Sequence, residues 1–246
     1  MGRGAEYIDR TMPPAWMQRW IPAAASRCAI CGAWPAQPLC DACVVRFAQP
    51  CHRCALCALP LPSDVEVCGA CLRTPPPLDA CHAAVVYAYP WSGLIARFKF
   101  SGEPGWAAAL AQRMARAPGV AQEIARADLL LPMPLAPRRL AERGFNQALL
   151  LARALGSGKV EAQLLLRLRE TASQTALERK AREKNVDGAF GVEPLRAQEL
   201  RGAAVLLVDD VMTSGASLHA AARAVRQAGA QRVAAVVLAR TDAPGA

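Results

Sequence analysis

The sequence has no apolar run that approaches the roughly 20 residues required by a membrane-spanning helix. Residues 1–20, MGRGAEYIDRTMPPAWMQRW, also lack the apolar core of a secretory signal peptide. These two absences predict a cytoplasmic protein that does not insert into a membrane. Because thiols stay reduced in the cytoplasm, we do not expect disulfide bonds to stabilise the chain.

Cysteine is absent from the last two thirds of the chain, and all ten cysteines lie between Cys28 and Cys81. Eight of them form four Cys-x-x-Cys pairs. Two residues between thiols let one tight turn direct both sulfurs to one metal ion, and two such turns complete a tetrahedral site. The spacing therefore predicts two structural zinc ions in a double zinc ribbon, with these ligands: Cys28, Cys31, Cys40 and Cys43 for the first, and Cys54, Cys57, Cys68 and Cys71 for the second.

Some alternatives remain open in this segment. Cys51 lies three residues before Cys54, so these two could form a turn in place of Cys54 and Cys57. Cys81 and His82 open an apolar segment, where we expect buried residues rather than ligands. Closed four-thiolate sites leave no coordination position for a substrate, so no chemistry is expected there. The ribbon could be purely structural or could bind nucleic acid or protein.

Composition and a proline-rich segment divide the chain into three parts. Proline-rich residues 74–77 predict a stiff linker between a ribbon at 28–77 and a larger domain at 78–246, with an extension at 1–27. The chain is 53% hydrophobic and 20% charged, which suits a buried core. Its formal net charge of +9 favours anionic partners such as phosphates or nucleic acid without choosing between them.

The larger domain alternates predicted strands and helices, and its central strands are continuous apolar runs. This pattern predicts an α/β fold with a mostly parallel sheet and helices on both faces. Ligands of such sheets bind outside the carboxyl ends of the strands. We expect strands at 81–89, 128–131, 164–168, 189–192, 203–210 and 232–240, and helices at 91–102, 105–117, 145–155 and 215–228. A shorter helix is expected to follow Pro118 and Gly119.

The segment VLLVDDVMTSGASL, residues 205–218, carries most of the functional information. An apolar strand would deliver Asp209 and Asp210 to its carboxyl end, where carboxylates suit ribose hydroxyls or Mg²⁺. A hydroxyl-rich turn with Gly215 would then open a helix, and free backbone N–H groups at a helix start suit a phosphate. Together these features predict a pocket for a phosphorylated sugar.

This segment resembles the motif with which type I phosphoribosyltransferases bind 5-phosphoribosyl 1-pyrophosphate (PRPP). Residues 131–155 and 169–190, together with the paired Cys-x-x-Cys units, are similar to the ComF/GntX family. The resemblance covers roughly residues 28–240. It implies a double zinc ribbon followed along the chain by a type I phosphoribosyltransferase-like fold.

The resemblance also implies roles for individual residues. Asp209 and Asp210 would meet the ribose hydroxyls, directly or through Mg²⁺. The 5′-phosphate would lie against Thr213, Ser214, Gly215, Ala216 and Ser217, where Ser217 replaces the more usual threonine but keeps the hydroxyl. Pyrophosphate would bind at the turn of Met133, Pro134 and Leu135, with charge from Arg138, Arg139 and Arg143. Residues 174–185 would form part of a hood, with the basic residues Arg179, Lys180, Arg182 and Lys184.

Three functions fit this set of residues. The first is a phosphoribosyltransferase whose acceptor is unknown, because no nucleobase-reading segment is recognisable. The second, implied by the ComF resemblance, is a role in DNA uptake, with single-stranded DNA and DNA-uptake proteins as partners. The third is a regulator that binds PRPP without turnover.

Overall fold

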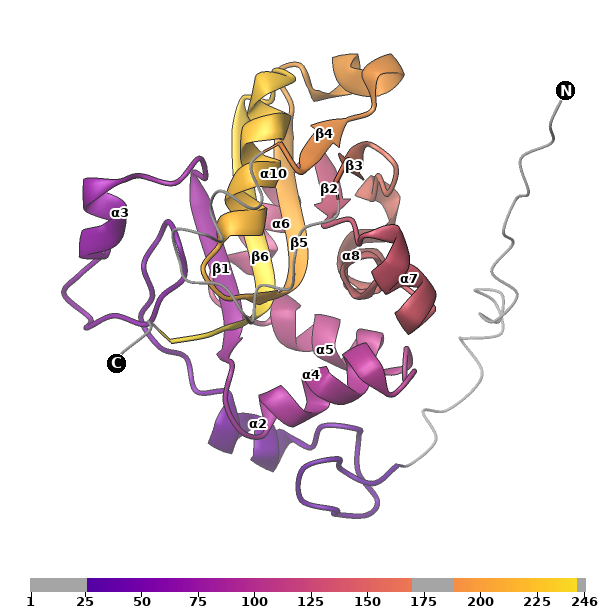
Figure 1. The fold of residues 1–246 in the computed structure, drawn as a ribbon. Coiled ribbons are helices and arrows are strands. Elements are labelled where there is room, and N and C mark those ends of the chain that lie inside the picture. Colours follow the sequence, from indigo (N-terminus) through magenta and orange to yellow (C-terminus); the bar gives the residue numbers. More distant parts are fainter. Residues whose placement is uncertain (1–25, 170–187, 243–246) are drawn as a thin grey trace, which may run out of the picture. The chain divides into compact units, whose positions relative to one another are not determined.

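A computed structural model describes residues 26–169 and 188–242 of the chain (Figure 1). The chain divides into two compact units, up to Cys43 and from Val44 onward, and each is described by itself. The helices are α2 Asp41–Phe47, α3 Gly69–Arg73, α4 Trp91–Phe100, α5 Trp106–Ala115, α6 Val120–Arg126, α7 Pro137–Arg143, α8 Gln147–Gly156, η1 Ser157–Lys159, η3 Pro194–Leu200 and α10 Ala216–Gln227. The strands are β1 Ala80–Val86, β2 Leu129–Pro132, β3 Leu165–Arg167, β4 Phe190–Val192, β5 Ala204–Met212 and β6 Arg232–Arg240.

The first unit is built around a tight turn and a β-bridge. Ser26 and Ala36 pair as an antiparallel bridge. Gly32 donates its backbone N–H to the Cys28 carbonyl at 2.8 Å and has a φ of +75°, a conformation that glycine adopts without strain. The two cysteines of the first Cys-x-x-Cys pair are therefore carried by one closed turn.

The main sheet of the second unit contains four parallel strands in the order β1-β6-β5-β2. The register pairs Val86 with Arg240 and Asp209 with Val237, and it pairs Pro132 with Val208. The predicted parallel sheet is confirmed. Because all four strands run the same way, the segments that follow β1, β2 and β5 emerge at one edge.

Both faces of this sheet are covered. Leu206, Leu207 and Val208 follow one another in β5 and are all fully buried, although successive side chains of a strand point to opposite faces. On one face, Val205 and Leu207 join a core cluster with α10, which lies along β5 and β6 (Figure 1). Helices α5 and α8 contact the sheet as well, through β6 and β5 respectively.

Two predicted strands form a separate small sheet. β3 and β4 pair with each other antiparallel, through Leu165 with Val192 and Arg167 with Phe190. They form no ladder with the main sheet, but Leu165 and Phe190 are buried in the core cluster against which α10 also packs.

Within the described residues, five short helices are additions to the predicted set: α2, α3, α7, η1 and η3. None of the seven residues of α7 is buried, so its sequence carries no apolar periodicity that would have indicated a helix. Within residues 26–169 and 188–242, no helix is both long and apolar enough to cross a membrane.

Candidate functional site

Eight cysteines form two groups of four, as their spacing predicted. The first cysteine cluster is Cys28, Cys31, Cys40 and Cys43, and the second is Cys54, Cys57, Cys68 and Cys71; within each, all ligand atoms lie within 4.8 Å of one another. Four thiol sulfurs at this separation suit a tetrahedral zinc ion. Among the described residues, Cys51 belongs to neither cluster, so the turn that uses Cys54 and Cys57 is the one the structure forms.

The two clusters repeat one local arrangement. A backbone N–H approaches a ligand sulfur in each, from Cys40 to Cys28 Sγ at 3.5 Å and from Cys68 to Cys54 Sγ at 3.4 Å. Such contacts stabilise the negative charge of a metal-bound thiolate. The two groups therefore fit zinc in the same way.

Cys81 is buried apart from both clusters, as expected for a core residue. Its sulfur lies 3.7 Å from Met212 Sδ. Burial, together with the charge of Cys57, raises the pKa of the Cys81 thiol to about 12. The thiol therefore stays protonated and serves in packing.

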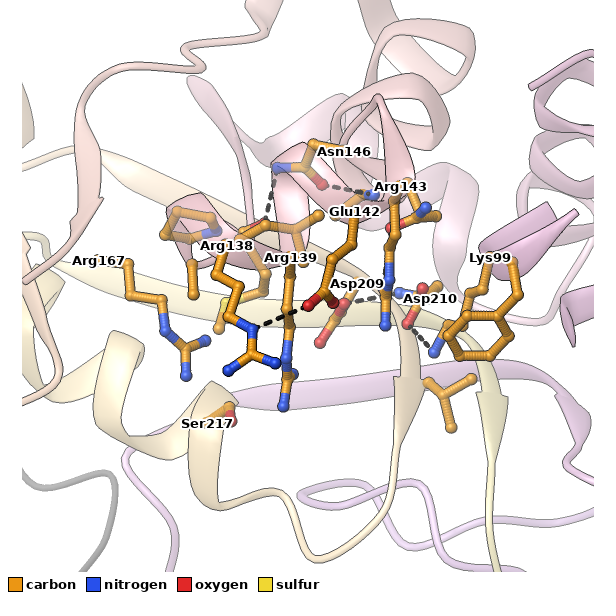
Figure 2. Close-up of a pocket in the computed structure, with 18 of the residues that line it drawn as sticks. Lys99, Arg138, Arg139, Glu142, Arg143, Asn146, Arg167, Asp209, Asp210 and Ser217 are labelled. Carbon is orange, nitrogen blue, oxygen red and sulfur yellow. Dashed lines mark hydrogen bonds and ion pairs between the residues drawn. The ribbon is translucent and has the colours of Figure 1, made fainter. Parts of the chain in front are cut away.

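A cavity of about 970 Å³ opens at the carboxyl edge of the main sheet and is called the edge pocket here. It is lined by residues that follow β1, β2 and β5 and by residues of α4, α7 and α8 (Figure 2). The predicted acidic residues, the turn after β2 and the arginines of α7 all meet in it. Its volume falls in the range of small-molecule and cofactor sites.

Asp209 and Asp210 lie side by side in β5, two residues before the strand ends at Met212. The strand is longer than the predicted 203–210, so the carboxylates extend from the strand itself rather than from its tip. The Asp210 N–H donates to Asp209 Oδ1 at 2.8 Å. Burial and the adjacent charge of Asp210 raise the pKa of Asp209 to about 7. A cation would relieve this repulsion, which suits a divalent metal.

Lys99 already supplies one positive charge to the acidic pair. Its Nζ lies 2.9 Å from Asp210 Oδ1, and it extends from the last turn of α4 (Figure 2). Sequence reasoning missed Lys99, because one lysine in an amphipathic helix resembles any exposed basic residue. The ion pair fixes the end of α4 beside the acidic pair.

The loop between β5 and α10, residues 213–215, has a geometry that suits an anion and is called the anion loop here. Gly215 has a φ of +82°, and a Cβ at this position would collide with the side chains of Met212 and His219. α10 then begins at Ala216, where the first N–H groups of a helix have no intrahelical carbonyl partner. Thr213 and Ser217 line the edge pocket beside this helix start. The positive φ and the close side chains both favour glycine at residue 215.

The Arg240 side chain, at the end of β6, fixes this loop by hydrogen bonds to backbone carbonyls. Its buried guanidinium donates to the Met212 carbonyl at 3.3 Å and to the Thr213 carbonyl. Its Nε donates to the carbonyl of Cys57, a member of the second cysteine cluster, at 2.9 Å. One side chain thus joins the second cluster to the anion loop, a link between residues far apart in sequence that no local pattern indicates.

The turn after β2 is fixed by Asn146. Its amide donates to the Met133 carbonyl at 3.0 Å, and its Oδ1 accepts a hydrogen bond from the Ala148 N–H at 3.0 Å, which caps α8. The sequence suggested a helix start here but no role for Asn146. The structure shows that this residue ties the turn of Met133, Pro134 and Leu135 to the helix behind it.

Three predicted basic residues of α7 line the edge pocket: Arg138, Arg139 and Arg143. Arg143 donates to Gln147 Oε1 at 3.0 Å, and burial lowers its pKa while the charges of Asp210 and Asp209 oppose this shift. Arg167, which the sequence reasoning did not select, lines the same cavity (Figure 2). The predicted hood residues Arg179, Lys180, Arg182 and Lys184 lie outside the described residues.

Comparison with known proteins agrees with this architecture. Residues 142–245 match the phosphoribosyl transferase domain family. The DNA utilization protein YhgH of Salmonella typhimurium (strain LT2) is 31% identical over 209 residues, which cover 82% of this chain and 90% of that protein. Competence protein F of Haemophilus influenzae is 30% identical over 73% of this chain and 81% of that protein. Competence protein ComFC of Bacillus subtilis is 34% identical over 41% of this chain and 39% of that protein.

The chain belongs to the ComF family. Its fold is that of the type I phosphoribosyltransferase domain, with two four-cysteine clusters in the N-terminal part. The two relatives at 31% and 30% identity cover 82% and 73% of this chain, so the sequence-based assignment to this family is confirmed.

Proposed function

We propose that this ComF family protein binds PRPP together with Mg²⁺ in the edge pocket and takes part in DNA utilisation. The observation that carries the proposal is the meeting of three groups in one cavity: the acidic pair, the anion loop at the start of α10, and the arginines of α7. Each group suits one part of PRPP.

The charges of the cavity match those of the ligand. The helix start and the hydroxyls of Thr213 and Ser217 suit a phosphate monoester. Arg138 and Arg139 suit a pyrophosphate. The Asp209 and Asp210 carboxylates suit ribose hydroxyls or Mg²⁺, and their oxygen donors are those that Mg²⁺ prefers. A simple phosphate site would not need the acidic pair.

The role in DNA utilisation draws on the relatives, whose names refer to DNA utilization and competence. The formal net charge of +9 is compatible with an anionic strand as partner. Single-strand binding would weaken steeply with added salt, because phosphate contacts release counterions.

Calorimetric titration with PRPP, with and without Mg²⁺, tests the first part of the proposal. The wild-type protein should bind in the presence of Mg²⁺, and Asp209→Asn combined with Asp210→Asn should abolish binding while circular dichroism stays native. Asp128→Asn is a matched control, because Asp128 caps the other end of the sheet by accepting from the Ala204 N–H at 2.8 Å. Unchanged affinity in the double variant would exclude the acidic pair as the ribose and metal site.

Turnover distinguishes an enzyme from a sensor. Release of pyrophosphate from PRPP, measured against a panel of acceptors, would support a phosphoribosyltransferase. PRPP binding without pyrophosphate release from any acceptor would support a regulator that uses PRPP as a signal.

A further inference from the structure

The turn that carries Cys54 and Cys57 contains a strained residue. Ala58 is fully buried, and among the described residues it alone combines a side chain with a positive φ, +56°. Contacts around such a residue must hold it, because residues other than glycine rarely adopt this conformation. The Ala58 N–H donates to the Cys54 carbonyl at 2.8 Å, and the Ala58 carbonyl accepts from Arg53 Nη1 at 3.0 Å. A zinc ion bound to both sulfurs would close the same turn, so the turn depends on metal and hydrogen bonds together.

The next carbonyl along this turn, that of Cys57, connects it to the anion loop through one guanidinium. Arg240 Nε donates to the Cys57 carbonyl at 2.9 Å. Arg240 Nη1 donates to the Met212 carbonyl at 3.3 Å and to the Thr213 carbonyl. A guanidinium is planar and rigid, so its nitrogen atoms cannot move independently. A displaced Cys57 carbonyl would therefore turn the donor that holds the anion loop.

The space between the turn and the anion loop is filled by side chains. Cys81 donates its N–H to the carbonyl of Ala55, which lies inside the turn, at 2.8 Å. Its sulfur lies 3.7 Å from Met212 Sδ, and the Met212 side chain would collide with a Cβ at Gly215. Met212 and all residues of the second cysteine cluster belong to one buried core cluster. Because close-packed interiors transmit displacements, a rearranged turn cannot be absorbed locally.

We propose that zinc binding at the second cysteine cluster is coupled through Arg240 to the conformation of the anion loop. The metal then supports the loop in the form that accepts a phosphate, in addition to closing the ribbon. Coupling between two binding sites is reciprocal, so a ligand at the loop should retain the zinc ion by the same factor. This reciprocal part rests on the proposed function, whereas the coupling itself concerns the protein without ligand.

Hydrogen exchange followed by mass spectrometry tests the coupling in the full chain without ligand. Arg53→Met removes the donor to the Ala58 carbonyl and changes no residue of the cluster or the anion loop. It should speed amide exchange in residues 213–219, the anion loop and the first turn of α10, by about tenfold, a usual coupling between sites. The amides of residues 206–208 in β5 should keep their protection, which shows that the fold is intact.

Cysteine variants provide a larger perturbation and a matched control. Cys71→Ser removes one ligand from the second cluster, and Cys31→Ser removes one from the first. Each should retain about one zinc ion per chain in a metal assay, compared with about two in the wild type. Only Cys71→Ser should speed exchange in the anion loop. If Cys71→Ser does not fold, the milder Arg53→Met still decides the question.

Combining Arg53→Met with Arg240→Met tests whether the guanidinium transmits the effect. Arg240→Met alone should speed exchange in the anion loop, because the Met212 and Thr213 carbonyls lose their donor. Arg53→Met should then add little, since both changes act through one contact. Equal acceleration by Arg53→Met in both backgrounds, or no acceleration in the wild-type background, would overturn the proposal.

The chromogenic chelator pyridylazoresorcinol measures the reciprocal effect as the rate of zinc loss. Saturating PRPP with Mg²⁺ should slow the loss of one zinc ion about tenfold in the wild type and leave Arg240→Met unaffected. A wild type that binds PRPP by calorimetry but loses zinc at an unchanged rate would also overturn the proposal. If the wild type binds no PRPP, the proposed function fails, and the exchange measurements alone decide whether the coupling stands.

Discussion

The two cysteine clusters share their ligand chemistry and nearly their spacing, yet their surroundings differ. All four residues of the second cluster are buried and belong to the core cluster of the sheet. In the first cluster, Cys31 is exposed and Cys40 is half-buried. The Cys57 carbonyl, moreover, accepts a hydrogen bond from Arg240, which also holds the anion loop. The same motif can thus close a small unit of its own or form part of the core that supports a site.

The largest contrast should appear when one ligand is removed from each cluster. Cys71→Ser should lower the free energy of unfolding of the second unit by about 4 kcal/mol, because it would release a zinc ion held by this cluster and would open the core. Cys31→Ser should leave unfolding of the sheet nearly unchanged. Urea denaturation followed by circular dichroism measures both, and equal losses would show that the clusters do not differ in this way.

A substitution at Arg240 tests whether the second cluster and the anion loop are energetically coupled. Arg240→Met should lower the free energy of unfolding by about 3 kcal/mol, because the carbonyls of Cys57, Met212 and Thr213 lose a buried charged donor. It should also weaken PRPP binding. Arg226→Met, which removes an ion pair to Asp79 at 2.6 Å on the surface, is the control. Unaltered PRPP affinity in Arg240→Met would disprove the link.

The anion loop itself can be tested at one residue. Gly215→Ala should lower the free energy of unfolding by about 1–2 kcal/mol, because it combines a positive φ with a collision against Met212. Gly144→Ala is the matched control: its φ is +79°, but a Cβ there meets no atom within 4 Å. The difference between the unfolding temperatures of the two variants separates the effect of the collision from that of the backbone conformation. Equal shifts would mean that only the backbone conformation matters.

The remaining contrast concerns pH and the acidic pair. The pKa of Asp209 is raised to about 7, so the carboxyl is partly protonated at neutral pH. Binding of Mg²⁺ with PRPP requires the ionised form, so affinity should increase as pH rises and level off above about pH 7.5. Below pH 7 the change should approach tenfold per pH unit, accompanied by release of one proton. Calorimetry in buffers of different ionisation enthalpy measures that proton.

The same raised pKa predicts an opposite pH trend for the stability of the protein without Mg²⁺. An unfolded aspartate ionises near pH 4. Asp209 therefore binds more protons in the folded than in the unfolded state between about pH 4 and 7, so its contribution to the free energy of unfolding should fall as pH rises through that window. In Mg²⁺-free buffer, the stability of the wild type relative to Asp209→Asn should therefore fall from about pH 4 to about pH 7, and a difference that is constant or rises over this range would contradict the assignment for Asp209.

The sequence predicted well those features that depend on neighbours along the chain. The cysteine pairs, β5 and the start of α10 are local patterns, and the structure has them in the expected positions. Short helices without a buried face, such as α7, escaped prediction because exposed residues leave no periodic trace. Asn146 was visible as a residue of a helix start, but its bond to Met133 joins two separate segments.

Residue chemistry and spacing by themselves determined the two four-cysteine clusters, the parallel sheet and the segments that form the edge pocket, because strand period and turn chemistry depend on consecutive residues. Only the tertiary structure decided that Lys99 pairs with Asp210, that Arg240 joins Cys57 to the anion loop, and that Tyr87 and Phe100 share a cavity with the acidic pair. These contacts arise where parallel strands bring distant segments to one edge of the sheet. Which of these contacts form depends on the order of the strands in the sheet, and the residue pattern within one strand does not determine that order.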